Sequence, residues 1–278
     1  MIERFMGCYS TLKAIPVPVD SNWDVSVPNM LAAYNQATEQ GKKVSAVVVV
    51  NPNNPTGSMY GRELMLEVMQ FAKERDMHVI VDEIYFLSTY EGKFDSILSY
   101  SRQWPDPLRT HFLWGFSKDM SLSGGRCGVI VSKNPDIHTM FAKSIAFMHF
   151  VPGIIQMKLC NVLKDKVWVD EMLDSSRSRL RANSQIVMET LDKLELTYLR
   201  PRGCLFMWVD FSKLFKSLPP TREEAETIFN RIIDYKIYIS WGAGFNAPKP
   251  EFFRIVYAVP RENIALAMQR FEKFVAEY

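Results

Sequence analysis

Short β-branched runs that alternate with helical patterns constrain the fold of this chain more than any other feature. The clearest runs are Ala46–Val50 and His78–Val81, and the amphipathic segment Arg62–Arg75 lies between them. Apolar strands of this length, separated by helices, predict a mostly parallel sheet with helices on its faces. Ligands of such sheets bind at the carboxyl ends of the strands. The loops that follow the strands are therefore where a functional site is expected.

The remaining pattern predicts a second, smaller α/β unit behind a long helix. Further strands are predicted at Ala14–Val19, His111–Phe116, Cys127–Val131, Leu205–Val209, Lys236–Ser240 and Phe252–Ala258. Further helices are predicted at Thr221–Ile233 and Arg261–Glu277. We therefore expect a large domain over residues 1–153, a long connecting helix over 154–195 and a small C-terminal domain over 196–278.

Composition excludes several classes of function. The chain has 278 residues, 47% of them hydrophobic and 23% charged, and a net charge of +2. Without a basic stripe, an acidic tail or a long apolar run, neither nucleic acid nor a membrane is expected as a partner. The first residues are too short and too charged for a signal peptide, so we expect a cytoplasmic protein. The cysteines form no CxxC pair and the histidines lack metal-ligand spacing, which predicts free thiols and no metal site.

Three loops carry candidate functional residues. The first is Asn51–Gly57, directly after a predicted strand; the second carries Asp82 and Tyr85; the third carries Lys118 and Arg126. Each has an ordinary interpretation when it is taken alone. The first can be a tight turn, the second a helix cap with Tyr85 in the core, and the third a solvated surface segment in which Lys118 has no function.

Taken together, the three loops resemble the class I/II aminotransferases of pyridoxal-phosphate (PLP) fold type I. The motifs N-P-x-N-P-T-G, D-E-x-Y and S-K-x-x-x-x-x-G-x-R are matched in order through Asn54, Asp82, Tyr85, Lys118 and Arg126. The branch resembled most is that of the 1-aminocyclopropane-1-carboxylate (ACC) synthase-like proteins, especially those of animals. The segments that carry this likeness are 107–112, 117–120, 241–245 and 252–254. The resemblance runs from about Ala14 to the C-terminus.

The resemblance implies a PLP cofactor and a role for each residue around its ring. Lys118 is expected to carry the cofactor as a Schiff base and to move the α-proton of an amino-acid substrate. Asp82 is expected to pair with the pyridine N–H and keep the ring electron-accepting. Tyr85 and Asn54 are expected to hydrogen-bond the phenolic oxygen of the cofactor, with Asn54 also near the substrate.

The remaining roles concern the cofactor phosphate and the substrate α-carboxylate. Arg126 is expected to bind the cofactor phosphate, and Ser117 is a further candidate there, although it is not assumed to replace the family's phosphate-binding serine. That serine falls at position 115, which is Gly115 in this chain. Losing one charge-assisted hydrogen bond of roughly 1.5–3 kcal/mol weakens cofactor binding by about ten- to a hundredfold. Arg254, on a strand of the small domain, is expected to bind the substrate α-carboxylate.

A larger departure concerns the N-terminal portion of the family. Family members carry a first strand and helix, a glycine-containing phosphate loop and a ring-stacking aromatic residue ahead of the segment that begins near Ala14. Residues 1–13 have no convincing counterpart, so we expect a fragment, an alternative isoform or an incomplete gene model. The expected fold is then a PLP fold type I large domain, incomplete at its N-terminus, plus a small α/β domain.

Two classes of function remain open at this point. The first is a PLP-dependent aminotransferase or ACC-synthase-like lyase that acts on an α-amino acid as a homodimer, as the resemblance implies. General transamination or β-elimination is favoured slightly over ACC formation, because the animal-like segments point away from the plant enzymes. The second is a catalytically impaired or inactive family member with a binding or scaffold role. A nicotinamide-binding protein is disfavoured, because no GxGxxG follows the early strands.

Overall fold

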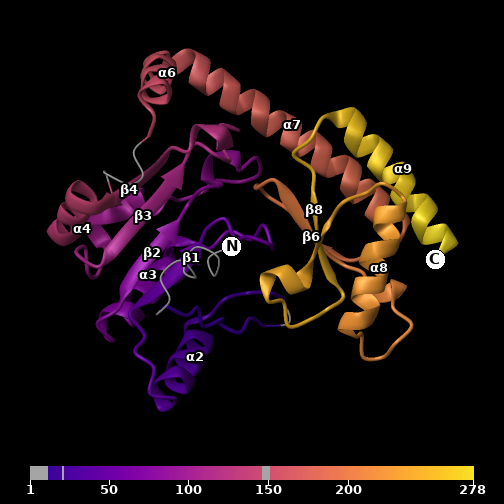
Figure 1. Ribbon diagram of the computed structural model, residues 1–278, viewed down its shortest axis with the longest axis horizontal. Coiled ribbons are helices and arrows are strands. Elements are labelled where there is room, and N and C mark those ends of the chain that lie inside the picture. The colour runs from indigo at the N-terminus through magenta and orange to yellow at the C-terminus, as the bar shows by residue number, and fades with distance from the viewer. Residues whose placement is uncertain (1–11, 21, 146–150) are drawn as a thin grey trace.

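The protein consists of two sheets that are joined by long helices (Figure 1). The computed structural model describes residues 12–20, 22–145 and 151–278. The larger sheet lies in the N-terminal half and the smaller sheet in the C-terminal half, each with its own hydrophobic core. No helix in these ranges is both long and apolar enough to cross a bilayer.

The larger sheet confirms the predicted mostly parallel arrangement. Its described strands follow the order β1 (Ala46–Val50), β2 (His78–Asp82), β3 (Thr110–Gly115) and β4 (Gly128–Ser132). The pairs β1–β2 and β2–β3 are parallel, whereas β4 runs antiparallel to β3. Residues 116–127 connect β3 to β4 and contain one short 3-10 helix, η3 (Ser123–Gly125), rather than the crossover α-helix that usually joins parallel strands.

Two helices cover the core of this sheet. Helix α3 (Arg62–Lys73) was expected from the sequence, and it buries Met65, Val68 and Met69 almost completely. Helix α2 (Val27–Glu39) was not expected. It begins after Ser26, whose hydroxyl accepts a hydrogen bond from the Asn29 N–H, and a proline lies in its first turn. After β4, the short helix α4 (Pro135–Met140) begins in the same way after Asn134.

Two of the predicted strands are wrong in whole or in part. The segment Ala14–Val19 contains no strand, because Pro16 and Pro18 lack the N–H groups that a strand needs for pairing. The segment Lys236–Ser240 contributes only its last residue to β7 (Ser240–Trp241). Lys236 has a left-handed backbone with φ +60, so the chain turns there before it can pair.

The connector predicted as one long helix is two helices. Helix α6 (Gly153–Lys164) ends at Asp165, and α7 (Lys166–Lys193) begins immediately after it. Asp165 has a non-helical backbone, and its carboxylate accepts a hydrogen bond from the Trp168 N–H at 3.0 Å. This side-chain cap starts the second helix. Helix α7 then runs from the larger unit across to the smaller one (Figure 1).

The smaller sheet is antiparallel throughout the described residues. Its order is β5 (Tyr198–Leu199), β6 (Phe206–Asp210), β8 (Phe252–Val256) and β7. Helices α8 (Arg222–Asp234) and α9 (Arg261–Glu277) complete this unit, and α9 packs against α7. The boundaries of the three parts expected from the sequence, at 153 and 195, stay predictions.

The two units meet where the chain around Gly203 approaches residues 88–91. The N–H groups of Tyr90 and Glu91 both donate to the Arg202 carbonyl oxygen, at 3.1 and 3.0 Å. A Cβ atom on Gly203 would lie 2.9 Å from the Cα atom of Thr89, so only glycine allows this approach. The Tyr257 hydroxyl donates to the Gly203 carbonyl oxygen at 2.8 Å and lies 3.0 Å from the Tyr90 hydroxyl.

Tyr257→Phe tests how much this junction contributes to stability. The variant keeps the buried ring but leaves the Gly203 carbonyl oxygen without its donor, so we expect the free energy of unfolding to fall by about 1–3 kcal/mol. Denaturant unfolding measures the change. Tyr238→Phe is the matched control, because Tyr238 is 81% exposed and its loss should change stability by less than about 0.5 kcal/mol. Equal effects in the two variants would contradict a stabilising junction.

Candidate functional site

The register of the parallel strands brings three loops to one edge of the larger sheet. Val50 pairs with Asp82, and Asp82 pairs with Leu113, so the carboxyl ends of β1, β2 and β3 lie at the same level. The loops that begin at Asn51, Glu83 and Phe116 all leave from this edge. This is where such sheets bind their ligands.

The loop after β1 is held rigidly by one buried amide. The Asn51 side chain is fully buried; its Nδ2 donates to the Tyr60 carbonyl oxygen at 3.0 Å, and its Oδ1 accepts from the Tyr60 N–H at 2.9 Å. Gly57 closes the turn in the left-handed region, with φ +75. Asn54 is thereby presented, half-buried, at the sheet edge.

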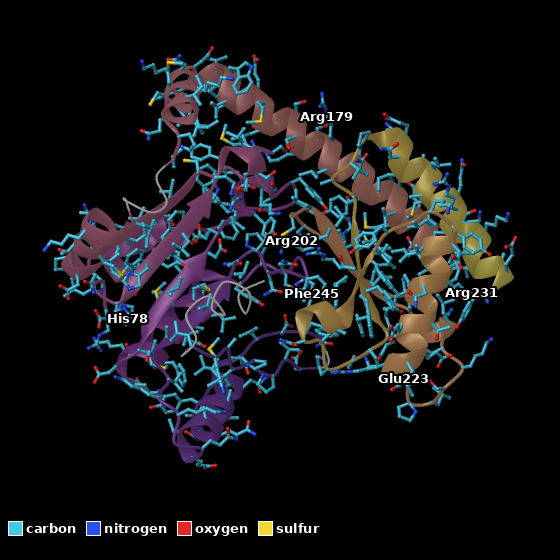
Figure 2. The ribbon with its side chains drawn as sticks, viewed as in Figure 1. His78, Arg179, Arg202, Glu223, Arg231 and Phe245 are labelled. Atoms are coloured by element: carbon cyan, nitrogen blue, oxygen red, sulfur yellow. The ribbon has the colours of Figure 1, made fainter. Side chains whose placement is uncertain are left out.

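Arg254 reaches this loop from the smaller sheet. Its Nη1 donates to Asn54 Oδ1 at 2.7 Å, although the two residues are 200 positions apart in the chain, and its Nη2 donates to Ser240 Oγ at 3.2 Å. The guanidinium lies 4.8 Å from the Phe206 ring centre and 4.6 Å from the Phe245 ring centre. Figure 2 shows Phe245 on the side of the smaller unit that faces β1–β4. The Arg254 Nε is buried and finds no partner among the described residues.

Asp82 and Tyr85 lie at the end of β2 and just beyond it. Burial raises the pKa of Asp82, while the Ile84 N–H, which donates to Oδ1 at 3.1 Å, opposes that shift. The Asp82 side chain makes no other hydrogen bond with the described residues. Tyr85 is 4% exposed and packs edge-on against Phe206. Burial raises the pKa of Tyr85 as well, which keeps its phenol protonated and able to donate.

Lys118 lies three residues beyond β3 in a short hydrogen-bonded turn. The Ser121 N–H donates to the Lys118 carbonyl oxygen at 3.1 Å, and the Leu122 N–H donates to the Phe116 carbonyl oxygen at 3.0 Å. The side chains of Lys118 and Ser117 are half-buried. Neither makes a hydrogen bond or an ion pair with any residue that the structure describes. The Lys118 amine is therefore available for a ligand.

Arg126 is the candidate least engaged with the others. It is exposed, and its Nη1 donates to the Ser123 carbonyl oxygen at 3.2 Å. The backbone nevertheless holds it near the Lys118 turn, because the Phe116 N–H donates to the carbonyl oxygen of neighbouring Cys127 at 3.2 Å. A Cβ atom on Gly115 would lie 3.2 Å from that same carbonyl oxygen. Gly115 therefore permits a close approach of two strands where a serine would be crowded.

The structure thus joins the predicted residues to different degrees. Asn54 and Arg254 are in direct contact, and Tyr85 shares the Phe206 ring with Arg254. Asp82 and Lys118 lie on adjacent strand-end loops of the same edge. Arg126 is linked to the site through the backbone only.

Sequence reasoning missed two buried carboxylates beside these residues. Asp119 is 3% exposed and Glu83 is 0% exposed. Burial raises the pKa of Asp119 to about 6 and that of Glu83 to about 7, although hydrogen bonds oppose both shifts. Their position beside Lys118 and Asp82 in the motifs was visible, but their burial was not. The rings that pack against Arg254 belong to Phe206 and Phe245, which lie in separate segments, so no local sequence pattern predicted them.

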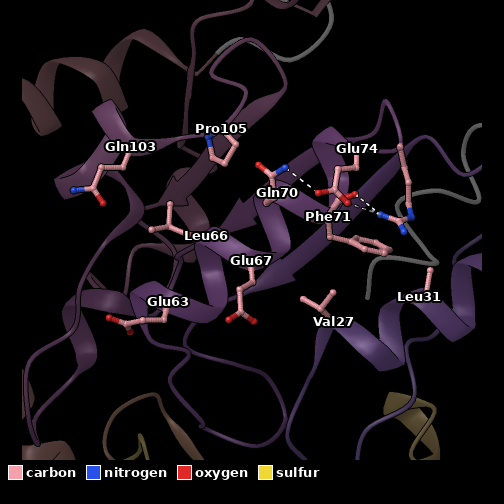
Figure 3. A pocket seen from close by; sticks show the side chains of 11 residues that line it. Val27, Leu31, Glu63, Leu66, Glu67, Gln70, Phe71, Glu74, Gln103 and Pro105 are labelled. Carbon is pink, nitrogen blue, oxygen red and sulfur yellow. Dashed lines mark hydrogen bonds and ion pairs between the residues drawn. The ribbon is translucent and has the colours of Figure 1, made fainter.

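Two cavities of the described structure lie away from these residues. One of about 670 Å³ opens between α2 and α3 and is lined by apolar side chains, two glutamines, Arg75, Glu63, Glu67 and Glu74 (Figure 3). Three carboxylates against one guanidinium leave this lining net acidic, which disfavours the phosphate of a cofactor. Another, of about 420 Å³, lies beside His78 at the opposite end of β2. None of the seven residues predicted for the site lines either cavity.

Comparison with known proteins decides the family. A sequence model of the family described as aminotransferase class I and II matches residues 7–271. The chain belongs to this family. Among curated relatives, it is 35% identical to the human 1-aminocyclopropane-1-carboxylate synthase-like protein 1, over 99% of this chain and 56% of the relative. It is 34% identical to the mouse protein named probable inactive 1-aminocyclopropane-1-carboxylate synthase-like protein 2, over 97% of this chain and 48% of the relative.

Solved aminotransferases share the fold. The aromatic aminotransferase from Pyrococcus horikoshii superposes with a TM-score of 0.77 at 22% identity, covering 94% of this chain and 66% of that one. The Thermus thermophilus aspartate aminotransferase with maleate gives 0.73 at 23% identity, covering 94% and 71%. The expected fold class, PLP fold type I, is thereby confirmed. This aminotransferase-family chain spans about half the length of the curated relatives that it matches.

The residues at the sheet edge suit the cofactor of this family in its ring region. The half-buried carboxylate of Asp82, with a raised pKa and one hydrogen bond among the described residues, would be stabilised by a protonated ring nitrogen. The free amine of Lys118 and the buried phenol of Tyr85 would supply the other groups that the ring needs. The fit is weaker at the phosphate end, where Arg126 points its guanidinium at Ser123 and residue 115 has no side chain.

Ser121→Gly tests the backbone conformation of the Lys118 turn in this aminotransferase-family chain. Ser121 has a left-handed backbone, with φ +53, which costs a non-glycine residue roughly 1–2 kcal/mol. After the entropic cost of glycine, we expect the variant to be about 0.5–1 kcal/mol more stable. Thermal and denaturant unfolding measure this. Ser123→Gly, two residues away without positive φ, should instead lower stability, and a gain in both variants would contradict the argument.

Proposed function

We propose that this aminotransferase-family chain provides the catalytic residues of a PLP-dependent enzyme that acts on an α-amino acid, with Lys118 as the amine that carries the cofactor. The single observation that supports this most strongly is the contact of Arg254 with Asn54 at 2.7 Å. It sets a guanidinium at the sheet edge that also carries Asp82 and Lys118. An α-amino acid needs this pairing of an anion site with a reactive amine.

Each residue then has a defined task. When bound, PLP supplies an aromatic ring that accepts electrons from the carbon next to the substrate amino group. Asp82 would hold a proton at the ring nitrogen, and Tyr85 would donate its hydroxyl hydrogen to the ring oxygen. Lys118 would take a proton from the substrate α-carbon and return it. Asn54 would orient both the ring oxygen and the guanidinium that it already contacts.

Arg254 is prepared for a carboxylate by its surroundings. Burial lowers its pKa, but a guanidinium stays charged in proteins, so it keeps its full anion-binding capacity. The rings of Phe206 and Phe245 pack against the half-buried guanidinium and help to hold it in place. At the other end of the site, Arg126 and Ser117 would bind the phosphate, which requires Arg126 to release the Ser123 carbonyl oxygen.

Three reaction outcomes use these same residues: transamination, β-elimination and ACC formation. A rice relative, 34% identical over 96% of this chain and 50% of its own length, is named 1-aminocyclopropane-1-carboxylate synthase 6. An Arabidopsis relative, 32% identical over 99% of this chain, is named probable aminotransferase ACS12. We favour transamination or elimination. A homodimer remains an expectation from the family resemblance, and a cytoplasmic location remains an expectation from the sequence.

A catalytically impaired protein with a binding or scaffold role is the second candidate. Two observations favour it: the exposed Arg126 guanidinium is turned to a backbone carbonyl, and Gly115 offers no hydroxyl to a phosphate. Both weaken the phosphate end of the site and leave the ring end intact. Under this alternative the chain binds PLP weakly or not at all.

Reductive trapping on Lys118 separates the two candidates. We expect the purified chain to turn yellow with added PLP and borohydride to fix one cofactor mass on the peptide that contains Lys118. Peptide mass mapping locates the adduct. Lys118→Ala should lose it, whereas Lys213→Ala, which removes an exposed lysine paired with Glu195, should retain it. A colourless protein, or adducts spread over surface lysines, would support the scaffold alternative.

Arg254→Lys tests the carboxylate site. Lysine replaces the planar fork of a guanidinium with a single ammonium on a flexible stem, so it binds a carboxylate without the paired geometry. The variant should therefore bind an α-amino acid about ten- to a hundredfold more weakly. Spectral titration of the PLP-loaded protein with alanine measures this. Ethylamine, which lacks the carboxylate, is the control ligand, and an equal loss for both ligands would exclude a carboxylate role.

A further inference from the structure

We propose that Asp119 is a positioning residue that locks the Lys118 turn to the loop carrying Asp82 and Tyr85. The inference rests on the proposed function, because it assigns Asp119 to the site where Lys118 acts. It concerns the geometry of the chain itself and is therefore testable with no cofactor bound. Asp119 directly follows Lys118 in the sequence, and its side chain is buried rather than solvated.

Three donors from two different elements converge on this carboxylate. The Ser88 hydroxyl donates to Oδ1 at 2.6 Å, and the Leu87 N–H donates to Oδ2 at 3.1 Å. The Trp114 indole N–H donates to Oδ2 at 2.9 Å. Ser88 and Leu87 belong to the loop after β2, and Trp114 belongs to β3.

This arrangement fixes one loop relative to the other. Asp119 lies 31 positions from Ser88 in the chain. Among the described residues, its carboxylate alone joins the turn 117–121 to the loop after β2 by hydrogen bonds. The Trp114 bond fastens the same carboxylate to the strand that precedes the turn. Movement of the Lys118 turn away from Tyr85 would therefore break charge-assisted hydrogen bonds in a buried place.

The charge of Asp119 also acts on its neighbours. All three partners are donors, so the ionised carboxylate is the form that they stabilise, while burial opposes ionisation and raises the pKa to about 6. Asp119 contributes to the raised pKa of Tyr85, on the loop after β2, and to that of Cys204, on the segment before β6. It thus helps to keep the Tyr85 phenol protonated.

Nuclear magnetic resonance of the tryptophan indoles tests the contact directly. The Trp114 indole proton, assigned with Trp114→Phe, should shift as Asp119 protonates when the pH falls through about 6. Asp119→Asn should abolish this titration. Ser88→Ala removes a donor to the ionised Asp119 carboxylate, so it should raise the pH midpoint of the Trp114 indole shift. An indole resonance that does not titrate in the wild-type chain would overturn the contact.

The positioning role is tested on the Lys118 amine in the same cofactor-free protein. Trace acetylation with peptide mass analysis follows the reactivity of Lys118 at a fixed pH. Without the Asp119 hydrogen bonds, the turn 117–121 is no longer fastened to the loop after β2. Asp119→Asn should therefore raise the acetylation rate of the half-buried Lys118 several-fold, and the PLP dissociation constant should rise about tenfold. Asp174→Asn, which removes an exposed carboxylate paired with Arg177, should change neither measurement.

The outcomes distinguish the two proposals. If the wild-type chain takes up no PLP while Lys118 reactivity responds to Asp119→Asn as expected, the proposed function fails and the positioning role stands. If PLP binds to Lys118 but Asp119→Asn alters neither the acetylation rate of Lys118 nor the PLP dissociation constant, only the positioning role is overturned. Thermal melting of each variant shows whether it is folded. If Asp119→Asn does not fold, Ser88→Ala and Trp114→Phe carry the same reactivity test with one donor removed at a time.

Discussion

The parallel register of β1, β2 and β3 is the constraint on which the site depends. Val50, Asp82 and Leu113 lie side by side across the three strands, so the loops after them begin at one edge. Motifs that are about thirty residues apart in the sequence become neighbours for this reason alone. A slip by one residue in either pair would turn Asp82 to the opposite face of the sheet. The hydrophobic core on one face of the strands opposes that slip, because the same shift would move the buried Val79 and Val81 to the more exposed face.

The second requirement is the approach of the smaller unit to that edge. Glycine at 203 lets the two backbones meet, and Tyr257 bridges the junction through its hydroxyl. Strand β8 then carries Arg254 to Asn54, where aromatic rings from β6 and the segment after β7 enclose it. The guanidinium thus depends on packing contributed by several separate segments. Its neighbourhood is a property of the domain junction rather than of its own strand.

Buried acids give the strand edge its electrostatic character. Asp82, Glu83 and Asp119 all have raised pKa values, chiefly through burial. They differ in their partners, and this difference separates their roles. Asp119 has three donors that brace the loops, whereas Glu83 receives the Ile97 N–H at 2.8 Å on Oε1 and keeps Oε2 buried without a partner among the described residues. Asp82 has only the Ile84 N–H and retains an oxygen for a ligand.

The sequence by itself determined the α/β class, the order of most strands and helices, and the three motif loops, because these follow from local periodicity and turn chemistry. It overestimated strands at 14–19 and 236–240, where missing N–H groups and a left-handed residue prevent pairing. Only the tertiary structure decided the rest. Burial singled out Asp119, and the junction of two sheets joined Arg254 to Asn54. Both depend on contacts between residues far apart in the chain, which no local pattern encodes.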